Sequence, residues 1–241
     1  MSGAIFVFFA FVATASLAME LLGAGEAEGS HKIELALAGQ SIGVVIALAL
    51  AVVWRRRPFA SPHAPLLPAP QAPWFTVRGW RVLRFCLCSW LVFLCAWVPL
   101  LVFGLTAVWR AFGWPMEAQP HLTYFATPSA TPWFASAALA VVVLGPILEE
   151  VVFRGFLHDG LRARLGPRAT ITVVAVLFGA MHVGDGGVLF VPTALLGALF
   201  GWLRERSGGL FAPIATHMLH NGATVALVVV SPSLVDWISR G

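Results

Sequence analysis

The chain has 241 residues, of which 59% are apolar and only 11% are charged, and its mean hydropathy is +0.86. Because a soluble domain carries about a quarter charged residues, this composition excludes an ordinary soluble globule and predicts a polytopic membrane protein. The net charge of +4 comes almost wholly from arginines at the ends of apolar runs. That pattern is a membrane-topology signal and argues against a nucleic-acid-binding surface.

Seven apolar segments follow one another, with lengths that suit membrane helices rather than alternating barrel strands. They cover about residues 3–22, 33–54, 83–109, 132–157, 168–183, 188–204 and 211–231. The first has no basic residues before it, so we expect a transmembrane helix and not a cleaved signal peptide. The sequence therefore predicts an all-α, polytopic transmembrane bundle of about seven helices.

The connecting loops alternate between arginine-rich and arginine-poor. Eleven basic residues fall in the second, fourth and sixth loops, and three fall in the odd-numbered loops and the tail. The positive-inside rule therefore places the even-numbered loops in the cytoplasm. We predict a multi-pass protein of the bacterial inner membrane, with a cytoplasmic N-terminus and an external C-terminus.

The second loop contains "PFASPHAPLLPAPQAP", with six prolines in sixteen residues, which is typical of an extended linker. The predicted organisation follows from this division. It comprises an N-terminal hairpin (1–57), a Pro-rich cytoplasmic linker (58–80), a third helix with an outer loop (81–130), a C-terminal core that carries the candidate site (131–232) and a tail (233–241).

Three cysteines, Cys86, Cys88 and Cys95, lie within the third apolar segment. Their C-x-C spacing indicates neither a zinc knuckle nor a redox pair. We expect all three to be small buried apolar residues.

Charged residues inside a membrane helix are costly, so they are candidates for function. In "ILEEVVFRGFL" (147–157), Glu150 and Arg154 are four residues apart, in the order that favours an ion pair on one helix face. Glu149 points about 100° away. We therefore predict that Arg154 neutralises Glu150, and that Glu149, for which the spacing offers no such base on its own helix, is suited to act as a general base.

A histidine in the next segment is predicted to lie at the same depth as Glu149. "FGAMH" places Phe178 and His182 four residues apart on one face. Glu149 is seventeen residues before Gly166 in the connecting turn, and His182 is sixteen after it. Because each helical residue rises about 1.5 Å, the two side chains should be level in antiparallel helices.

The last segment supplies a second histidine and an amide. "HMLHN" puts His217 and Asn221 on one face, with His220 off that face. In straight helices His217 would lie shallower than His182, and spacing alone does not choose between His217 and His220.

The three motifs E-E-x-x-x-R, F-x-x-x-H and H-x-x-x-N, in this order, resemble the CPBP family of intramembrane proteases. That family includes the type II CAAX prenyl endopeptidases and the bacterial Abi or lysostaphin-resistance-protein-A-like proteins. The resemblance covers about residues 131–232. It implies that Glu149 and His182 activate a water, and that His217 and Asn221 stabilise the oxyanion. It also implies that Glu150 and Arg154 hold the site in shape.

The resemblance implies an intramembrane endopeptidase of the glutamic type, without a cofactor. The alternative is a zinc enzyme with Glu149, His182 and His217 as ligands and a water in the fourth position. Expected partners are membrane lipid and a membrane-associated protein or peptide, with or without a lipid modification, and no nucleic acid. Two other functions stay open, a catalytically dispensable immunity or scaffold protein of the same family and a proton-coupled transporter.

Overall fold

The computed structural model describes residues 77–114, 116, 120–127, 134–183 and 187–239, together with six isolated helical residues within the first 76. Every element in these ranges is a helix, which confirms the all-α class. The predicted segments 3–22 and 33–54 and most of the linker lie outside the described residues. The chain divides into two compact units: unit 1 holds residues 1–69 and 129–170, and unit 2 holds 70–128 and 171–241.

Unit 1 contains one long continuous helix in its described part. Its segments are α6 (Phe134–Leu139), η2 (Ala140–Leu144), α7 (Gly145–Glu150), η3 (Val151–Leu157) and α8 (His158–Arg162), of which η2 and η3 are π-helical. The helix has 29 residues and reaches a mean hydropathy of 2.0 over its most apolar stretch. It is therefore long and apolar enough to cross a hydrocarbon core of ~30 Å.

The two π-helical segments lie on either side of α7. Pro146, the second residue of α7, has no N–H to donate to the preceding turn, and we attribute the widened turn of η2 to this missing donor. The second widened turn, η3, begins directly after Glu150. Such π-helical turns occur frequently at functional sites, and these two enclose the six residues that end in Glu149 and Glu150.

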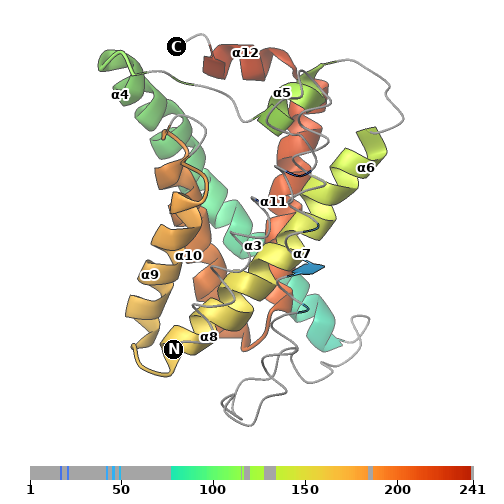
Figure 1. The fold of residues 1–241 in the computed structure, drawn as a ribbon, viewed down its shortest axis with the longest axis vertical. Helices are drawn as coiled ribbons and strands as arrows, with labels where there is room; N and C mark the ends of the chain where they lie inside the picture. The colour runs from blue at the N-terminus through green and yellow to red at the C-terminus, as the bar shows by residue number, and fades with distance from the viewer. Residues whose placement is uncertain are drawn as a thin grey trace. The chain divides into compact units, whose positions relative to one another are not determined.

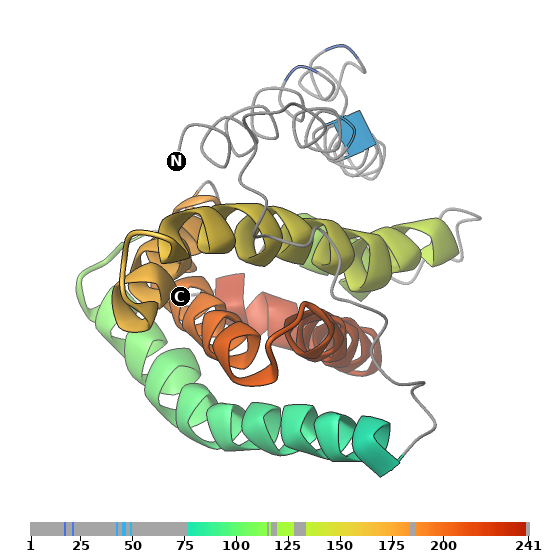
Figure 2. The same cartoon turned by 90° about the horizontal axis from the view of Figure 1, so that it is seen from below.

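Unit 2 begins with a second long helix, which curves along its length in Figure 2. It consists of α3 (Val77–Trp97), the π-helical η1 (Val98–Leu105) and α4 (Thr106–Ala111). The remaining helices are α5 (Pro120–Ala126), α9 (Pro167–Ala180, with its first four residues in unit 1), α10 (Phe190–Ser207), α11 (Phe211–Val230) and α12 (Ser233–Ser239).

Several helices of unit 2 pack around α11. This helix packs against both α10 and α3, and its outer part contacts α5 and α12 (Figure 1). The turn between α10 and α11 is short because Gly208 adopts φ 70°, a left-handed conformation that ends α10. The hairpin therefore brings the beginning of α11 directly beside the end of α10.

Each of the last five predicted segments corresponds to a helix, with shifted ends. The third begins at Val77 instead of residue 83, and the fourth continues to Arg162. Within the described ranges, three helices are long and apolar enough to span a membrane, at Trp80–Trp97, Phe134–Arg162 and Phe211–Val230. With 14 residues, α9 is only about 21 Å long. The total of seven crossings stays a prediction.

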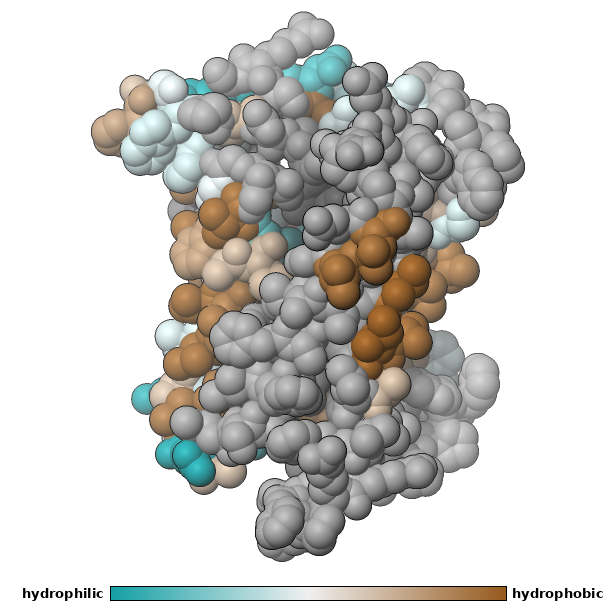
Figure 3. Space-filling view, in the orientation of Figure 1, coloured by the Kyte–Doolittle hydropathy of each residue, from teal (hydrophilic) through white to brown (hydrophobic). Residues whose placement is uncertain are grey.

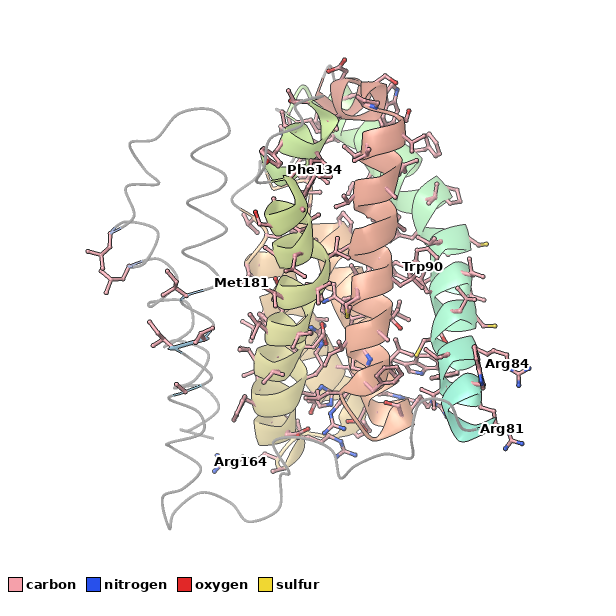
Figure 4. The ribbon with its side chains drawn as sticks, turned by 90° about the vertical axis from the view of Figure 1, so that its right-hand side faces the viewer. Arg81, Arg84, Trp90, Phe134, Arg164 and Met181 are labelled. Atoms are coloured by element: carbon pink, nitrogen blue, oxygen red, sulfur yellow. The ribbon has the colours of Figure 1, made fainter. Side chains whose placement is uncertain are left out.

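The surface of unit 2 has the character of a membrane protein. Figure 3 shows an apolar band over the side formed by α9 and α10, where Val173, Val176, Val191 and Leu195 are exposed. At one end of α3, Arg81 and Arg84 point away from the helices (Figure 4). The ring of Phe85 lies 5.4 Å from that of Trp202, so the basic ends of α3 and α10 lie at the same end of unit 2, as the loop pattern requires.

The expectation for the cysteines is correct at one position of three. Cys86 is buried, whereas Cys88 and Cys95 are exposed, and all three are free thiols. Residues 85–97 of this helix are almost uniformly apolar, so the sequence carries little signal of which face turns inward, and this explains the error. The exposed thiols lie on the side of α3 that also presents Leu87, Leu91 and Val92.

Candidate active site

An ion pair lies inside the long helix of unit 1. Arg154 donates from Nη1 to Glu150 Oε1 at 2.9 Å, and both side chains are 0% exposed. The pair predicted from the spacing is therefore present. Removing a charge from water costs several kcal/mol, so the contact between the two groups offsets part of the cost of burying them.

The neighbouring carboxylate has a different environment. Glu149 is only partly buried, and its Oε1 lies 3.8 Å from the point where a Cβ on Gly145 would stand. The side chain therefore leans back along its own helix toward the N-terminal end, as helical side chains do. One carboxylate is enclosed with its arginine and the other reaches a less buried position, so the two acids differ in environment.

In unit 2, His182 is held by the carbonyl of Phe178. The chain leaves α9 after Ala180, and the turn that follows places His182 Nδ1 2.8 Å from Phe178 O. A carbonyl oxygen can only accept, so Nδ1 carries the proton, and in the neutral ring Nε2 is then the basic nitrogen. This tautomer suits a general base, and it suits a metal ligand equally well.

The second predicted histidine contacts the same phenyl ring as His182. The ring centroid of Phe178 lies 4.9 Å from that of His182 and 5.9 Å from that of His217. His217 also stacks on Phe200 of α10, with centroids 4.6 Å apart and planes at 25°. The expected depth difference does not keep the histidines apart: Phe200 is seven residues before the last residue of α10 and His217 is six residues after the first residue of α11, so the two rings are level in this hairpin.

The structure distinguishes His217 from His220, which the spacing did not. His220 points to α3, where Trp90 Nε1 donates to His220 Nδ1 at 3.4 Å and the edge of Trp97 meets its ring. His217 instead lies among Phe178 and Phe200 with 4% of its surface exposed. In unit 2 it is therefore His217 that contacts the same phenyl ring, Phe178, as His182 does.

The remaining predicted residue, Asn221, lies on α11 one helical turn after His217 and is partly buried. Phe178, His182 and His217 are thus brought together in unit 2, and Glu150 with Arg154 in unit 1. The convergence of Glu149 with the histidines stays a prediction, because Glu149 belongs to the other compact unit.

Two residues with no predicted role belong to these clusters. Phe200 is fully buried and forms the stacking surface for His217. His158 is 1% exposed, although its place near the end of a span favours a solvated side chain. It follows Glu150 and Arg154 at the same four-residue interval, and this spacing was the signal that it belongs to the buried row.

A metal centre needs at least three protein ligands. Among the described residues, no three or more His, Cys, Asp or Glu side chains are grouped so as to hold a metal ion. The zinc set of Glu149, His182 and His217 draws on both units. The donor chemistry of an imidazole, with Nδ1 bonded and Nε2 basic, fits such a ligand, so the choice between water activation with and without zinc belongs to experiment.

Comparison with known proteins points to one family. Residues 131–223 match the family described as type II CAAX prenyl endopeptidase Rce1-like. The chain is 32% identical over 110 residues to an Escherichia coli protein named "Uncharacterized 24.3 kDa protein", covering 43% of this chain and 49% of that protein. It is 31% identical over 85 residues to "Putative membrane peptidase YdiL" of Bacillus subtilis (strain 168), covering 35% and 34%.

The chain therefore aligns with about half, or less, of the length of these curated relatives. No solved structure matches it. The matched region contains Glu149, Glu150, Arg154, Phe178, His182, His217 and Asn221. The apolar helices and this match together support an integral membrane protein, and residues 131–223 are similar to the type II CAAX prenyl endopeptidase Rce1-like family.

Proposed function

We propose that the protein is an intramembrane endopeptidase in which Glu149 and His182 activate a water molecule. The observation that carries the proposal is the pair of imidazoles around Phe178, one of which has its Nδ1 bonded to a carbonyl. A basic Nε2 within an apolar, aromatic surrounding provides what proton abstraction requires. The similarity of residues 131–223 to a membrane-protease family supports a reaction class in which such a base is used.

In the proposed reaction, water attacks the carbonyl carbon of a peptide bond while Glu149 or His182 takes one of its protons. The carbonyl oxygen becomes negatively charged, and His217 with Asn221 donates hydrogen bonds to it. The C–N bond then breaks, and the abstracted proton passes to the leaving amine. Preorganised donors of this kind are worth roughly 2.7–4 kcal/mol each in related chemistry.

The ion pair of Glu150 and Arg154 is proposed to position Glu149. Because the pair is closed within one helix, it fixes that turn and keeps the adjacent carboxylate on the other side. We propose a membrane-associated protein or peptide as substrate, with a lipid-modified one as the first to test, because the matched family description names prenylated substrates.

The proposal is tested by comparing membranes that carry the intact protein, Glu149→Gln or His182→Ala. N-terminal proteomics should detect new cleavage ends with the intact protein only. Asp236→Asn on α12, an exposed carboxylate, serves as the matched control and should cleave as the intact protein does. Equal cleavage by Glu149→Gln in a folded, inserted protein would rule the proposal out.

The metal question has a separate test. We propose the metal-free mechanism, and 1,10-phenanthroline should then leave cleavage unchanged, as its non-chelating 1,7-isomer does. Loss of activity with the chelating isomer alone, restored by added zinc, would favour the zinc enzyme. If Glu149→Gln instead complements a cellular phenotype fully, the immunity or scaffold alternative is the better one. Proton flux in liposomes that depends on Glu149 would favour the transporter.

We propose a bacterial inner-membrane location with the N-terminus in the cytoplasm and the C-terminus outside. Support comes from unit 2, where Arg110 Nη2 donates to Trp237 O at 2.6 Å, so the third loop and the tail lie at the same end of α3–η1–α4. Alkaline phosphatase fused after residue 241 should be active, and a fluorescent protein fused there should be dark. The reverse pattern would invert the proposed topology.

A further inference from the structure

The seam between α3 and α11 contains a polar contact that the proposed reaction does not use. Trp90 Nε1 donates to His220 Nδ1 at 3.4 Å, and Trp97 meets the same imidazole edge-on with ring centroids 5.7 Å apart. One helix turn before Trp90, the thiol of Cys86 contacts Ala212 O at 3.8 Å. Cys86, Trp90 and Trp97 recur at helical spacing, so they form one face of α3.

The facing row on α11 has the same regularity. Ala212, Thr216 and His220 are four residues apart, and the first two are 0% exposed. His217 lies about 60° around the helix from His220, on the side that stacks against Phe200. His217, His220 and Asn221 all belong to α11, so any rotation of α11 that breaks the contact with α3 also turns His217 and Asn221.

Apolar packing alone does not explain a histidine at position 220. Trp90 is 9% exposed, and an apolar residue opposite it would leave a buried indole N–H without an acceptor, which is destabilising. Between membrane helices, such a hydrogen bond also specifies one orientation where apolar packing would accept several. Because Nδ1 accepts, a neutral His220 carries its proton on Nε2.

We propose that His220 is a positioning residue: through its hydrogen bond from Trp90 it sets the rotation of α11 and so aims His217 and Asn221 at the reacting carbonyl. This rests on the proposed function, because positioning has meaning only if His217 and Asn221 act on a substrate. His220 itself touches neither water nor substrate in this role.

The test combines substitutions that remove the donor, remove the acceptor or replace the acceptor. Trp90→Phe removes the N–H and keeps a ring. His220→Leu removes the acceptor at similar bulk, and His220→Asn restores an acceptor because its Oδ1 can stand near the place of Nδ1. Trp114→Phe is the matched control, since Trp114 stacks on Phe112 in the loop after α4.

The first readout is cleavage kinetics. Misplacing reacting groups by about 1 Å can cost on the order of a hundredfold in rate. We expect Trp90→Phe and His220→Leu to lower kcat by about ten- to a hundredfold with little change in KM. His220→Asn should recover most of kcat, and Trp114→Phe should match the parent. Unchanged kcat in His220→Leu would overturn the proposal.

The second readout does not depend on protease activity. With Cys88 and Cys95 changed to serine, Cys86 is the remaining thiol of the three in the chain, and it lies in the same seam. Its reaction with a small methanethiosulfonate reagent in detergent should accelerate in Trp90→Phe and His220→Leu, and stay slow in His220→Asn. Lower kcat with unchanged labelling would also overturn the proposal, because the effect would not pass through the seam.

The two readouts distinguish a failure of the proposed protease function from a failure of the positioning role of His220. If the parent cleaves nothing, the proposed function fails and the positioning role fails with it, whatever the thiol does. If the parent is active and all variants are equally active, the positioning role fails alone. A merely structural role would lower protein yield and thermal stability without the selective loss of kcat and its rescue by asparagine.

Discussion

The ion pair of unit 1 and the histidine cluster of unit 2 are assembled in opposite ways. Glu150 and Arg154 are four residues apart on one helix and contact at 2.9 Å. His217 meets Phe178 and Phe200, which come from α9 and α10 and lie 39 and 17 residues earlier in the chain. The first arrangement depends on one helix being formed. The second depends on three helices being packed in the correct rotation.

This difference separates the substitutions that damage folding from those that damage geometry. A pair within one helix forms when that helix forms, and the loss of one partner leaves the charge of the other buried. A cluster built from three helices tolerates the loss of a ring but fails when the helices shift. Substitutions in the two regions should therefore differ in size and in kind.

The largest effect is expected from Arg154→Leu, which removes the guanidinium that Glu150 contacts. Breaking a buried pair by removing one partner costs about 3–5 kcal/mol. The double variant Glu150→Met/Arg154→Leu should recover most of that loss, because no buried charge remains. Unfolding of the purified protein by SDS titration in mixed micelles measures both. Equal destabilisation by the single and double variants would mean that the two side chains contribute bulk instead of charge.

A smaller effect is expected from Gly179→Ala, one residue after Phe178. An added Cβ would stand 2.7 Å from Phe190 O and 2.8 Å from Ala194 Cβ, so α9 and α10 must separate. Overpacking of this kind costs typically 1–3 kcal/mol, and it should disturb the histidine cluster and leave the ion pair intact.

Gly201→Ala is the matched control for Gly179→Ala. Its added Cβ would meet the Ile171 side chain at 3.3 Å, and a side chain can give way where a backbone carbonyl cannot. The same SDS titration should show a loss of under about 1 kcal/mol. If both glycines behave alike, the close approach of the backbone at Gly179 is not what fixes the α9–α10 packing.

The contrast between the two regions also explains what could be predicted from the sequence. The pairing of Glu150 with Arg154 follows from a spacing rule, and the apolar runs mark the helices of both units. The choice of His217 over His220 did not follow, because it depends on how α11 is rotated against α3 and α10. Two residues three apart on one helix carry no information about which partner each will meet.

The same reasoning covers the other differences. The short helices α5 and α12 lie in stretches predicted as a loop and a tail, and they gain stability from packing that no local pattern records. Tyr124, Phe125 and Val235 within them are buried, since α5 packs on both α11 and α12. The π-helical turns beside Pro146 and after Glu150 also depend on how the helix packs. An apolar stretch of sequence does not predict them.

The smallest effect concerns a third region, where the contact partners are 127 residues apart. Arg110 donates to Trp237 O at 2.6 Å and its guanidinium lies 4.7 Å from the centre of that indole, in an exposed position. An exposed cation–π contact contributes about 0.5–1 kcal/mol. Arg110→Met should therefore leave global stability nearly unchanged and accelerate backbone hydrogen exchange in α12 alone, because weakly held elements open locally.

Arg110→Lys separates the charge from the planar donor group. Lysine keeps the charge but cannot match the fork geometry and stacking of a guanidinium, so α12 should exchange at a rate between those of the parent and Arg110→Met. If all three exchange alike, the contact of Arg110 with Trp237 is not what holds α12 in place.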